Sequence, residues 1–294
     1  MDIFILQLIN GLSLGSIYAL VALGYSMVYG IVKLINFAHG DIIMVSCFTM
    51  YTAMEIAGLP LLVSIPLTLI LTAVLGIIIE KLAYDRLISK GVERISLLIT
   101  AIGVSIFLQS TFQLIFKADS LRYQAFLPSK TISLFGIEPS LKSVVTIIVS
   151  LVLMLALTLF VKLTKVGKAM RAASEDASAA KLMGINTSNV VAFTFAIGSL
   201  LAAVAGILYF ESYPRIEPYM GGMLGLKAFV AAVIGGIGSI PGAMAGGLIL
   251  GVAEAMTVSI GLSSYSDAVV FGILIIMLVL KPSGLFGKNI REKV

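Results

Sequence analysis

The sequence predicts an all-α fold, a polytopic bundle of transmembrane helices, from its composition and from the clustering of its apolar residues. Of the 294 residues, 59% are hydrophobic and only 12% are charged, whereas soluble domains have about 45–50% apolar and about 25% charged residues. Long runs such as 144–161 and 269–280 carry no charge, and about 20 apolar residues cross a bilayer as a helix. These runs do not alternate as membrane-barrel strands do, so helices remain as the structure that satisfies its own backbone in lipid.

Nine apolar segments follow one another along the chain, and we predict about eight membrane spans plus one broken or re-entrant segment. The segment 222–236 is the exception, because it is short and rich in glycine. The outer loop 117–141 contains helix-breaking Pro and Gly residues, which favour a short hairpin or a surface helix. The whole chain, 1–294, is predicted to be one transmembrane domain. The segments are 8–31, 40–57, 61–80, 95–116, 142–161, 189–210, 222–236, 241–260 and 267–281.

The distribution of Lys and Arg predicts the orientation, because cytoplasmic loops carry an excess of both. The C-terminus and the loops after the first, third and fifth segments together hold 14 of the 20 basic residues. We therefore expect the 162–188 loop and the C-terminus in the cytoplasm and the N-terminus outside. Anchoring to membrane lipid explains the net charge of +5 without nucleic acid. The start of the chain lacks a basic stretch, so we expect its first apolar run to be retained rather than cleaved.

The cytoplasmic segment 166–186 is too polar to cross the bilayer. Lys168–Leu182 is rich in alanine and has no internal Gly or Pro, which predicts one helix. Gly184 follows at a natural C-cap position, and Asn186 is a candidate N-cap for the next span. Such a short helix is marginal alone in water. The residues leave two interpretations open: a helix that docks in the groove of a partner, or a connecting helix packed on its own protein.

Four stretches together resemble the permease subunits of ATP-binding-cassette (ABC) importers of branched-chain amino acids. The segment GKAMRAASEDASAAKLMGI at 167–185 resembles the coupling segment of that family. Gly11–Leu20 is similar to its first span, Asn36–Asp41 to its block before the second span, and Gly235–Ala243 to its Gly-rich turn. The Asn36–Asp41 block resembles the first of the two paralogous permeases of the high-affinity leucine, isoleucine and valine type.

This resemblance implies a location in the bacterial inner membrane and a set of partners. These are a second, paralogous permease, two cytoplasmic ABC ATPase subunits that bind ATP, and a periplasmic or lipid-anchored solute-binding protein that delivers an amino acid. The implied contact with the ATPases lies in the segment 166–186. Its candidate residues are Lys168, Met170, Arg171, Ala172, Glu175, Asp176, Ala180, Leu182 and Gly184.

Motifs for chemistry within the chain itself are missing from the sequence. No G-x-x-x-x-G-K-[ST] phosphate loop is present, and Gly235–Gly242 has no Lys to meet phosphates. There is one cysteine, Cys47, and one histidine, His39, so no Cys/His metal spacing exists. We expect His39 to hydrogen-bond at the membrane edge. We predict no catalytic residue, no metal site and no cofactor in this chain, so that any ATP hydrolysis takes place in partner subunits.

Four polar residues within the spans are candidates for a translocation pathway. Ionisable groups in lipid are costly and by default indicate function. Glu254 lies inside 241–260 and Lys227 inside 222–236, and the two could pair or line a polar pathway. Gln109 and Gln113 lie one turn apart on 95–116 and form a weaker polar stripe. A buried structural hydrogen bond is the alternative for Glu254, and snorkelling to the interface is the alternative for Lys227.

Glycine pairs at four-residue spacing predict close helix packing. They are Gly11/Gly15, Gly221/Gly225, Gly242/Gly246 and Gly247/Gly251.

Other functions stay open at this stage. One is the same type of ABC permease for urea, short amides or another small solute. A second is a proton-driven secondary transporter with Glu254 as the proton carrier, and a third is a membrane scaffold without transport.

Overall fold

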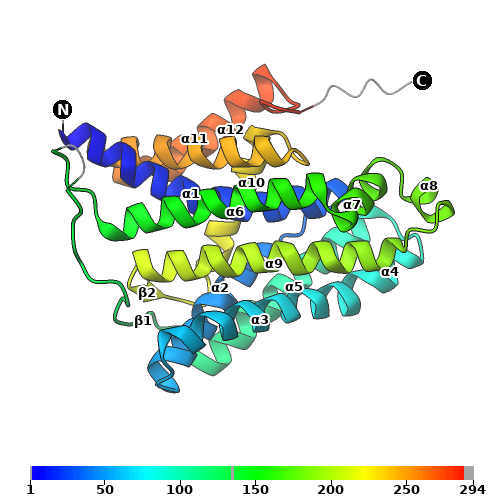
Figure 1. Cartoon of the computed structure of the whole chain (residues 1–294), viewed down its shortest axis with the longest axis horizontal. Helices are drawn as coiled ribbons and strands as arrows, with labels where there is room; N and C mark the ends of the chain where they lie inside the picture. The colour runs from blue at the N-terminus through cyan, green and yellow to red at the C-terminus, as the bar shows by residue number, and fades with distance from the viewer. Residues whose placement is uncertain (1, 134–135, 288–294) are drawn as a thin grey trace.

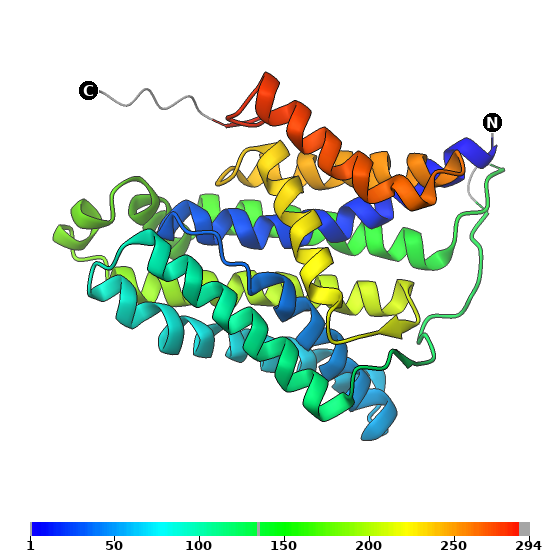
Figure 2. The ribbon, with the colours of Figure 1, turned by 180° about the vertical axis from the view of Figure 1, so that it is seen from behind.

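A computed structural model describes residues 2–133 and 136–287 and confirms a polytopic helical bundle (Figure 1). Within these described residues, seven helical stretches are long and apolar enough to cross a membrane. Most of the long helices run alongside one another, whereas the shorter apolar helix α10 crosses them (Figure 2). The seven stretches are Phe4–Val32, Leu61–Ser89, Ile95–Phe116, Leu141–Leu163, Thr187–Ser212, Ile240–Ser259 and Ser263–Leu280.

The first half of the described chain contains α1 to α5 and one short strand. Two π-helical turns, η1 and η2, continue α2 and α3, and Pro60 directly precedes α3. The bounds are α1 Asp2–Val32, α2 His39–Tyr51, η1 Thr52–Ile56, α3 Leu61–Ile79, η2 Glu80–Asp85, α4 Arg86–Ser89, α5 Arg94–Phe116 and β1 Leu121–Arg122.

The second half contains α6 to α12, a second short strand and one 3-10 turn. Side-chain caps begin three of the long helices, because Ser140, Asn186 and Ser239 each accept a hydrogen bond from a backbone N–H three residues on. The bounds are α6 Leu141–Leu163, α7 Lys165–Glu175, α8 Ala177–Leu182, α9 Thr187–Ser212, β2 Arg215–Ile216, α10 Met220–Gly235, α11 Ile240–Ser259, η3 Ser263–Tyr265 and α12 Ser266–Leu280.

The segment predicted as the second span, 40–57, forms a core helix rather than one of the seven long apolar stretches. The chain after α1 runs back along the bundle before α2 begins (Figure 2), and Asn36 and Ala38 in this link are buried. His39 and Asp41 begin α2, and both are almost fully buried. These polar groups lower the apolar character of the helix, and the protein rather than lipid surrounds them.

Burial separates central from peripheral helices. In the most apolar window of α9, 67% of the residues are buried, whereas the corresponding share in the stretch that contains α12 is 6%. Helices α3, α5 and α6 also expose many large apolar side chains. Because lipid is as apolar as these side chains, such faces are expected of helices at the edge of a membrane bundle.

Glycine allows a close helix contact between α1 and α11. A Cβ placed on Gly15 would lie 2.8 Å from the carbonyl oxygen of Gly247, and one on Gly11 would lie 2.8 Å from the Cα of Val252. Gly251 in turn meets the backbone of Gly15. The packing role predicted for these pairs is confirmed.

The segment 166–186 forms two helices, α7 and α8. The prediction of a single helix over Lys168–Leu182 was therefore wrong. The break lies at Asp176, whose backbone is extended (φ −152°, ψ 105°). Its carboxylate accepts hydrogen bonds from the N–H groups of Ser178 and Ala179 at 2.8 and 2.9 Å, so it caps α8. Asp side chains hydrogen-bond to nearby backbone N–H groups in this way, so Asp is disfavoured in helix interiors and favoured at N-caps. Gly184 ends α8 with φ 83° and Asn186 caps α9, as predicted.

The described parts of the link, 117–133 and 136–140, contain a short strand and turns but no helix. Its strand β1 pairs antiparallel with β2, which follows α9, and Thr131 bridges Ser140. The carboxylate of Glu211, at the end of α9, accepts hydrogen bonds from the N–H groups of Phe126 and Leu127. This link is therefore fastened to the end of α9.

A bulky side chain at Gly15 tests the glycine contact. We expect Gly15→Leu to lower the melting temperature of the purified chain, because overpacking costs about 1–3 kcal/mol or more. The matched control is Gly103→Leu on α5, where a Cβ meets nothing within 4 Å. Equal melting temperatures for the two variants would contradict this packing.

Candidate functional site

Four helices, α1, α10, α11 and α12, meet at a largely buried ion cluster, here defined as Lys227, Glu254, Asp267 and Tyr18. The Lys227 Nζ on α10 lies 2.6 Å from the Glu254 Oε1 on α11 and 2.7 Å from the Asp267 Oδ1 on α12. The Tyr18 hydroxyl on α1 donates to the Glu254 Oε2 at 2.9 Å. The Lys227 and Glu254 side chains are only 9% and 11% exposed, so water screens their attraction little.

Lys227 and Glu254 form an ion pair, which was one of the alternatives left open by the sequence, but two members of the cluster were missed. Asp267 is the second residue of α12. Acidic residues are favourable in the first turn of a helix, so nothing in the sequence marked Asp267 as part of a cluster. Tyr18 lies among apolar residues of α1, so in the sequence it looks like an ordinary residue of the hydrophobic core. The lysine inside an apolar segment could have indicated further acidic partners, because a buried cation needs compensating negative charge.

The two glutamines on α5 do not join the ion cluster. The Gln109 Nε2 donates to the Asp41 Oδ1 on α2 at 2.8 Å, and the Gln113 Oε1 accepts from the Tyr219 hydroxyl just before α10 at 2.7 Å. The stripe therefore attaches α5 to α2 and to the start of α10. Asp41 was not predicted as a site residue, although it is 1% exposed.

The prediction that His39 hydrogen-bonds at the membrane edge was wrong, because the residue lies inside the bundle. It is 2% exposed and its ring meets that of Tyr25 edge-on at 4.9 Å. Within the described residues its Nε2 has no hydrogen-bond partner.

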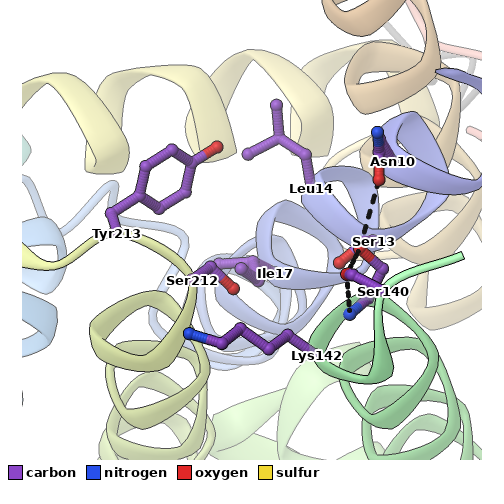
Figure 3. A pocket seen from close by; sticks show the side chains of 9 residues that line it. Asn10, Ser13, Leu14, Ile17, Ser140, Lys142, Ser212 and Tyr213 are labelled. Carbon is purple, nitrogen blue, oxygen red and sulfur yellow. Dashed lines mark hydrogen bonds between the residues drawn. The ribbon is translucent and has the colours of Figure 1, made fainter. Parts of the chain in front are cut away.

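A first pocket opens between the ends of α1, α6 and α9, and we call it the serine pocket (Figure 3). Its volume is about 210 Å³. Lys142 reaches across it toward α9 (Figure 3), where its Nζ lies 2.9 Å from the Glu211 Oε1. The Ser143 hydroxyl donates to the Asn10 Oδ1 at 3.2 Å. The lining residues are Asn10, Ser13, Leu14, Ile17, Ser140, Lys142, Ser143, Ser212 and Tyr213.

A second and larger pocket, the arginine pocket, lies beside the β1–β2 ribbon. Its volume is about 570 Å³, within the roughly 300–1,000 Å³ of small-molecule sites. It combines two guanidinium groups, one carboxylate and several aromatic rings. The lining residues are Arg122, Tyr123, Tyr209, Tyr213, Pro214, Arg215, Glu217 and Met220.

Tyr213 links both pockets to the ion cluster. It lines the serine pocket and the arginine pocket alike. Burial raises the pKa of its hydroxyl, the negative charge of Glu254 raises that pKa further, and the positive charge of Lys227 opposes this effect. The hydroxyl is therefore within electrostatic reach of Glu254 and Lys227.

The predicted contact residues of the segment 166–186 divide into inward and outward groups. Met170 and Ala180 are buried, and the Arg171 guanidinium donates to the Val161 carbonyl at 2.8 Å. Leu182 is 89% exposed, as is its neighbour Met183 at 84%. The remaining predicted residues, Lys168, Ala172, Glu175, Asp176 and Gly184, are exposed.

Comparison with known proteins shows similarity along almost the whole chain. The family described as "Branched-chain amino acid transport system / permease component" matches residues 7–278. The chain is 42% identical to the high-affinity branched-chain amino acid transport system permease protein BraD of Pseudomonas aeruginosa, with 99% of this chain and 98% of the relative covered. It is 43% identical, at the same coverage, to the corresponding permease protein LivH of Salmonella typhimurium.

Among solved structures, a chain of PsaBC from Streptococcus pneumoniae in complex with Fab aligns over 94% of this chain and 92% of that one. The TM-score is 0.48 and the sequence identity is 15%. The family match and the near full-length relatives lead to one conclusion: the chain belongs to the permease components of branched-chain amino acid transport systems.

Proposed function

We propose that the whole chain is one transmembrane permease domain that forms part of the pathway for leucine, isoleucine and valine in an ABC importer of the bacterial inner membrane. The observation that carries this proposal is the identity of 42–43% over 99% of the chain with high-affinity branched-chain amino acid permeases. It favours amino acids over urea, short amides or other solutes.

The partners belong to the same proposal. A second, paralogous permease completes the pathway, two cytoplasmic ATPase subunits bind and hydrolyse ATP, and a solute-binding protein delivers the amino acid from outside. The pathway in this chain begins at the serine and arginine pockets, passes Tyr213 and continues along the ion cluster. Gln109 and Gln113 support it by holding α2 and the start of α10.

Transport requires that the pathway hold its substrate only weakly, because the amino acid must leave again. A zwitterion needs a few polar groups for its charged ends and apolar surface for its side chain. ATP binding drives transport by stabilising one conformation of the assembly over another. In this proposal α7 and α8 transmit the movement, and the exposed side chains of Leu182 and Met183 insert into a groove of the ATPase.

The coupling role of α8 is tested in vesicles that contain the complete transport system. We expect ATP-dependent leucine uptake with the wild-type chain and a loss of at least about tenfold with Leu182→Ser and Met183→Ser combined, because two apolar contacts leave the ATPase interface. The ATPase should also co-purify less well with this variant.

The matched control is Leu62→Ser at the start of α3, since Leu62 is 88% exposed but lies at the opposite end of the bundle from α8. It should leave uptake and ATPase binding unchanged. Leucine uptake by the wild type without ATP would overturn the ABC mechanism itself.

The orientation is tested by labelling single cysteines with a membrane-impermeant maleimide in intact cells. The one native thiol, Cys47, is buried, so the background is low. We expect Ser120→Cys, between α5 and β1, to react from outside, and Ser178→Cys in α8 to react only after the cells are opened. The reverse pattern would place α8 outside and contradict the proposal.

The ion cluster is tested by neutralising its members one at a time. Lys227→Met leaves two carboxylates without their cation, so we expect the largest fall in melting temperature, corresponding to about 3–5 kcal/mol for a broken buried pair. Glu254→Gln should cost less, because Lys227 keeps Asp267. Asp267→Asn should cost least, because the Asp267 side chain is 47% exposed.

Leucine uptake by the folded variants then separates a pathway role from a structural one. We expect Glu254→Gln to reduce the uptake rate beyond its effect on the amount of folded protein. If Asp267→Asn destabilises the chain as strongly as Lys227→Met, the cluster is not organised around Lys227.

A further inference from the structure

The β1–β2 ribbon places two arginines directly opposite each other. The register pairs Arg122 with Arg215 and Leu121 with Ile216. Ile216 is fully buried, whereas both arginines are exposed and line the arginine pocket. Side chains directly opposite on an antiparallel pair have Cβ atoms about 4.5–5.5 Å apart. The two guanidinium groups therefore share one wall of one pocket.

Like charges in such a cross-strand pair are unfavourable for the ribbon. Over residues 2–133 and 136–287, neither guanidinium has an ion pair with an acidic side chain within 4.0 Å. The positive charge is therefore left available to the pocket. Guanidinium groups match carboxylates in a bidentate geometry, so the pair is suited to a carboxylate that enters from solution.

The ribbon is held firmly where it carries these arginines. The Tyr123 hydroxyl lies between the backbone carbonyl groups of Phe210 and Tyr213, which share its one proton, and the Tyr123 ring stacks on Phe210 at 3.5 Å and 8°. The adjacent chain is fastened through Glu211. A site on a rigid support loses less conformational freedom when it binds a ligand.

The other walls of the arginine pocket complete the match to an apolar amino acid. Tyr209, Tyr213 and Met220 supply aromatic and thioether surface for an aliphatic side chain, and Glu217 supplies a carboxylate for an ammonium group. An acidic side chain of a docking protein would gain from the arginines but would be repelled by Glu217. A zwitterion uses both charges.

We propose that the arginine pocket is an entry subsite in which Arg122 and Arg215 bind the α-carboxylate of the substrate amino acid and Glu217 faces its α-ammonium group. This proposal rests on the function proposed above. Because the guanidinium groups are exposed to water, their attraction is screened. The subsite therefore holds leucine briefly and orients it before it moves past Tyr213.

The test uses the purified full chain in nanodiscs and saturation-transfer NMR with three probes: leucine, 4-methylpentanoate, which lacks the ammonium group, and 3-methylbutylamine, which lacks the carboxylate. We expect leucine to bind best, 4-methylpentanoate more weakly and 3-methylbutylamine not measurably. Arg122→Gln and Arg215→Gln should each weaken leucine binding about threefold to fivefold, because each exposed and screened ion pair contributes little. Glu217→Gln should abolish the preference for leucine over 4-methylpentanoate.

Lys130→Gln is the matched control, because it removes one positive charge from the same link 117–140 without lining the pocket. It should leave all three affinities unchanged. Arg215→Lys keeps the charge but not the bidentate geometry, so it should lie between the wild type and Arg215→Gln. The glutamine variants should melt no lower than the wild type, because they relieve a repulsion.

Unchanged leucine binding in both arginine variants overturns the subsite. If the solute-binding protein also associates more weakly with these variants, the arginines bind acidic groups on that protein instead. In either case, ATP-dependent leucine uptake by the complete wild-type system would leave the proposed function standing, whereas absence of that uptake would remove the proposed function itself.

Discussion

Lys227 sets the constraint on which the C-terminal half of the bundle depends. A cation inside a low-dielectric interior must be compensated by charge, and Lys227 contacts one carboxylate on α11 and another on α12. Val270 is the one fully buried residue of α12, and partly buried side chains such as Phe271 and Leu274 pack beside it against the core. The contact between Lys227 and Asp267 adds a polar connection of α12 to the bundle.

The ion pair of 2.6 Å between α10 and α11 requires that the backbones come close, and small residues allow this. A Cβ on Gly242 or Gly246 of α11 would collide with the backbone of α10, at Gly235 and Ala231 respectively. Glycines of α10 meet α2 in the same way, at Gly40. Association of helices in lipid relies on such packing, because the hydrophobic effect does not favour protein contacts over lipid contacts.

Hydropathy predicted most of the fold because each span must satisfy its own backbone in lipid, which is a local condition. The glycine contacts could also be predicted from a local pattern, the four-residue spacing of the glycines. The break at Asp176 could not be predicted from helix propensity, because it depends on one side chain. The Asp176 carboxylate caps the start of α8 instead of lying within one continuous helix. The burial of Asp41, in the predicted span 40–57, and of His39 just before it could likewise not be predicted, because helices distant in sequence surround both side chains.

The candidate site was only partly accessible to sequence reasoning, because its members come together through tertiary contacts. Lys227 and Glu254 were visible as charges in apolar segments. Asp267 is an ordinary helix-start acid until the fold places it 2.7 Å from Lys227. The arginine pair depends on the register of a ribbon with two residues in each strand, joining segments more than 90 positions apart. No pattern of residue types in the sequence encodes that pairing.

The contrast between the exposed and the buried cations has a consequence for transport under the proposed function. Arg122 and Arg215 face an open pocket without an acidic partner among the described residues, so a carboxylate can reach them at little cost. Lys227 already contacts two carboxylates, and a substrate carboxylate would have to displace one of them. Asp267 is the easier to displace, because water replaces its lost contact. A conformational change that moves α12 away from α10 would therefore remove Asp267 from Lys227 and leave a place for a substrate carboxylate beside the remaining pair with Glu254. Under the proposed function, this links passage beyond Tyr213 to the position of a peripheral helix.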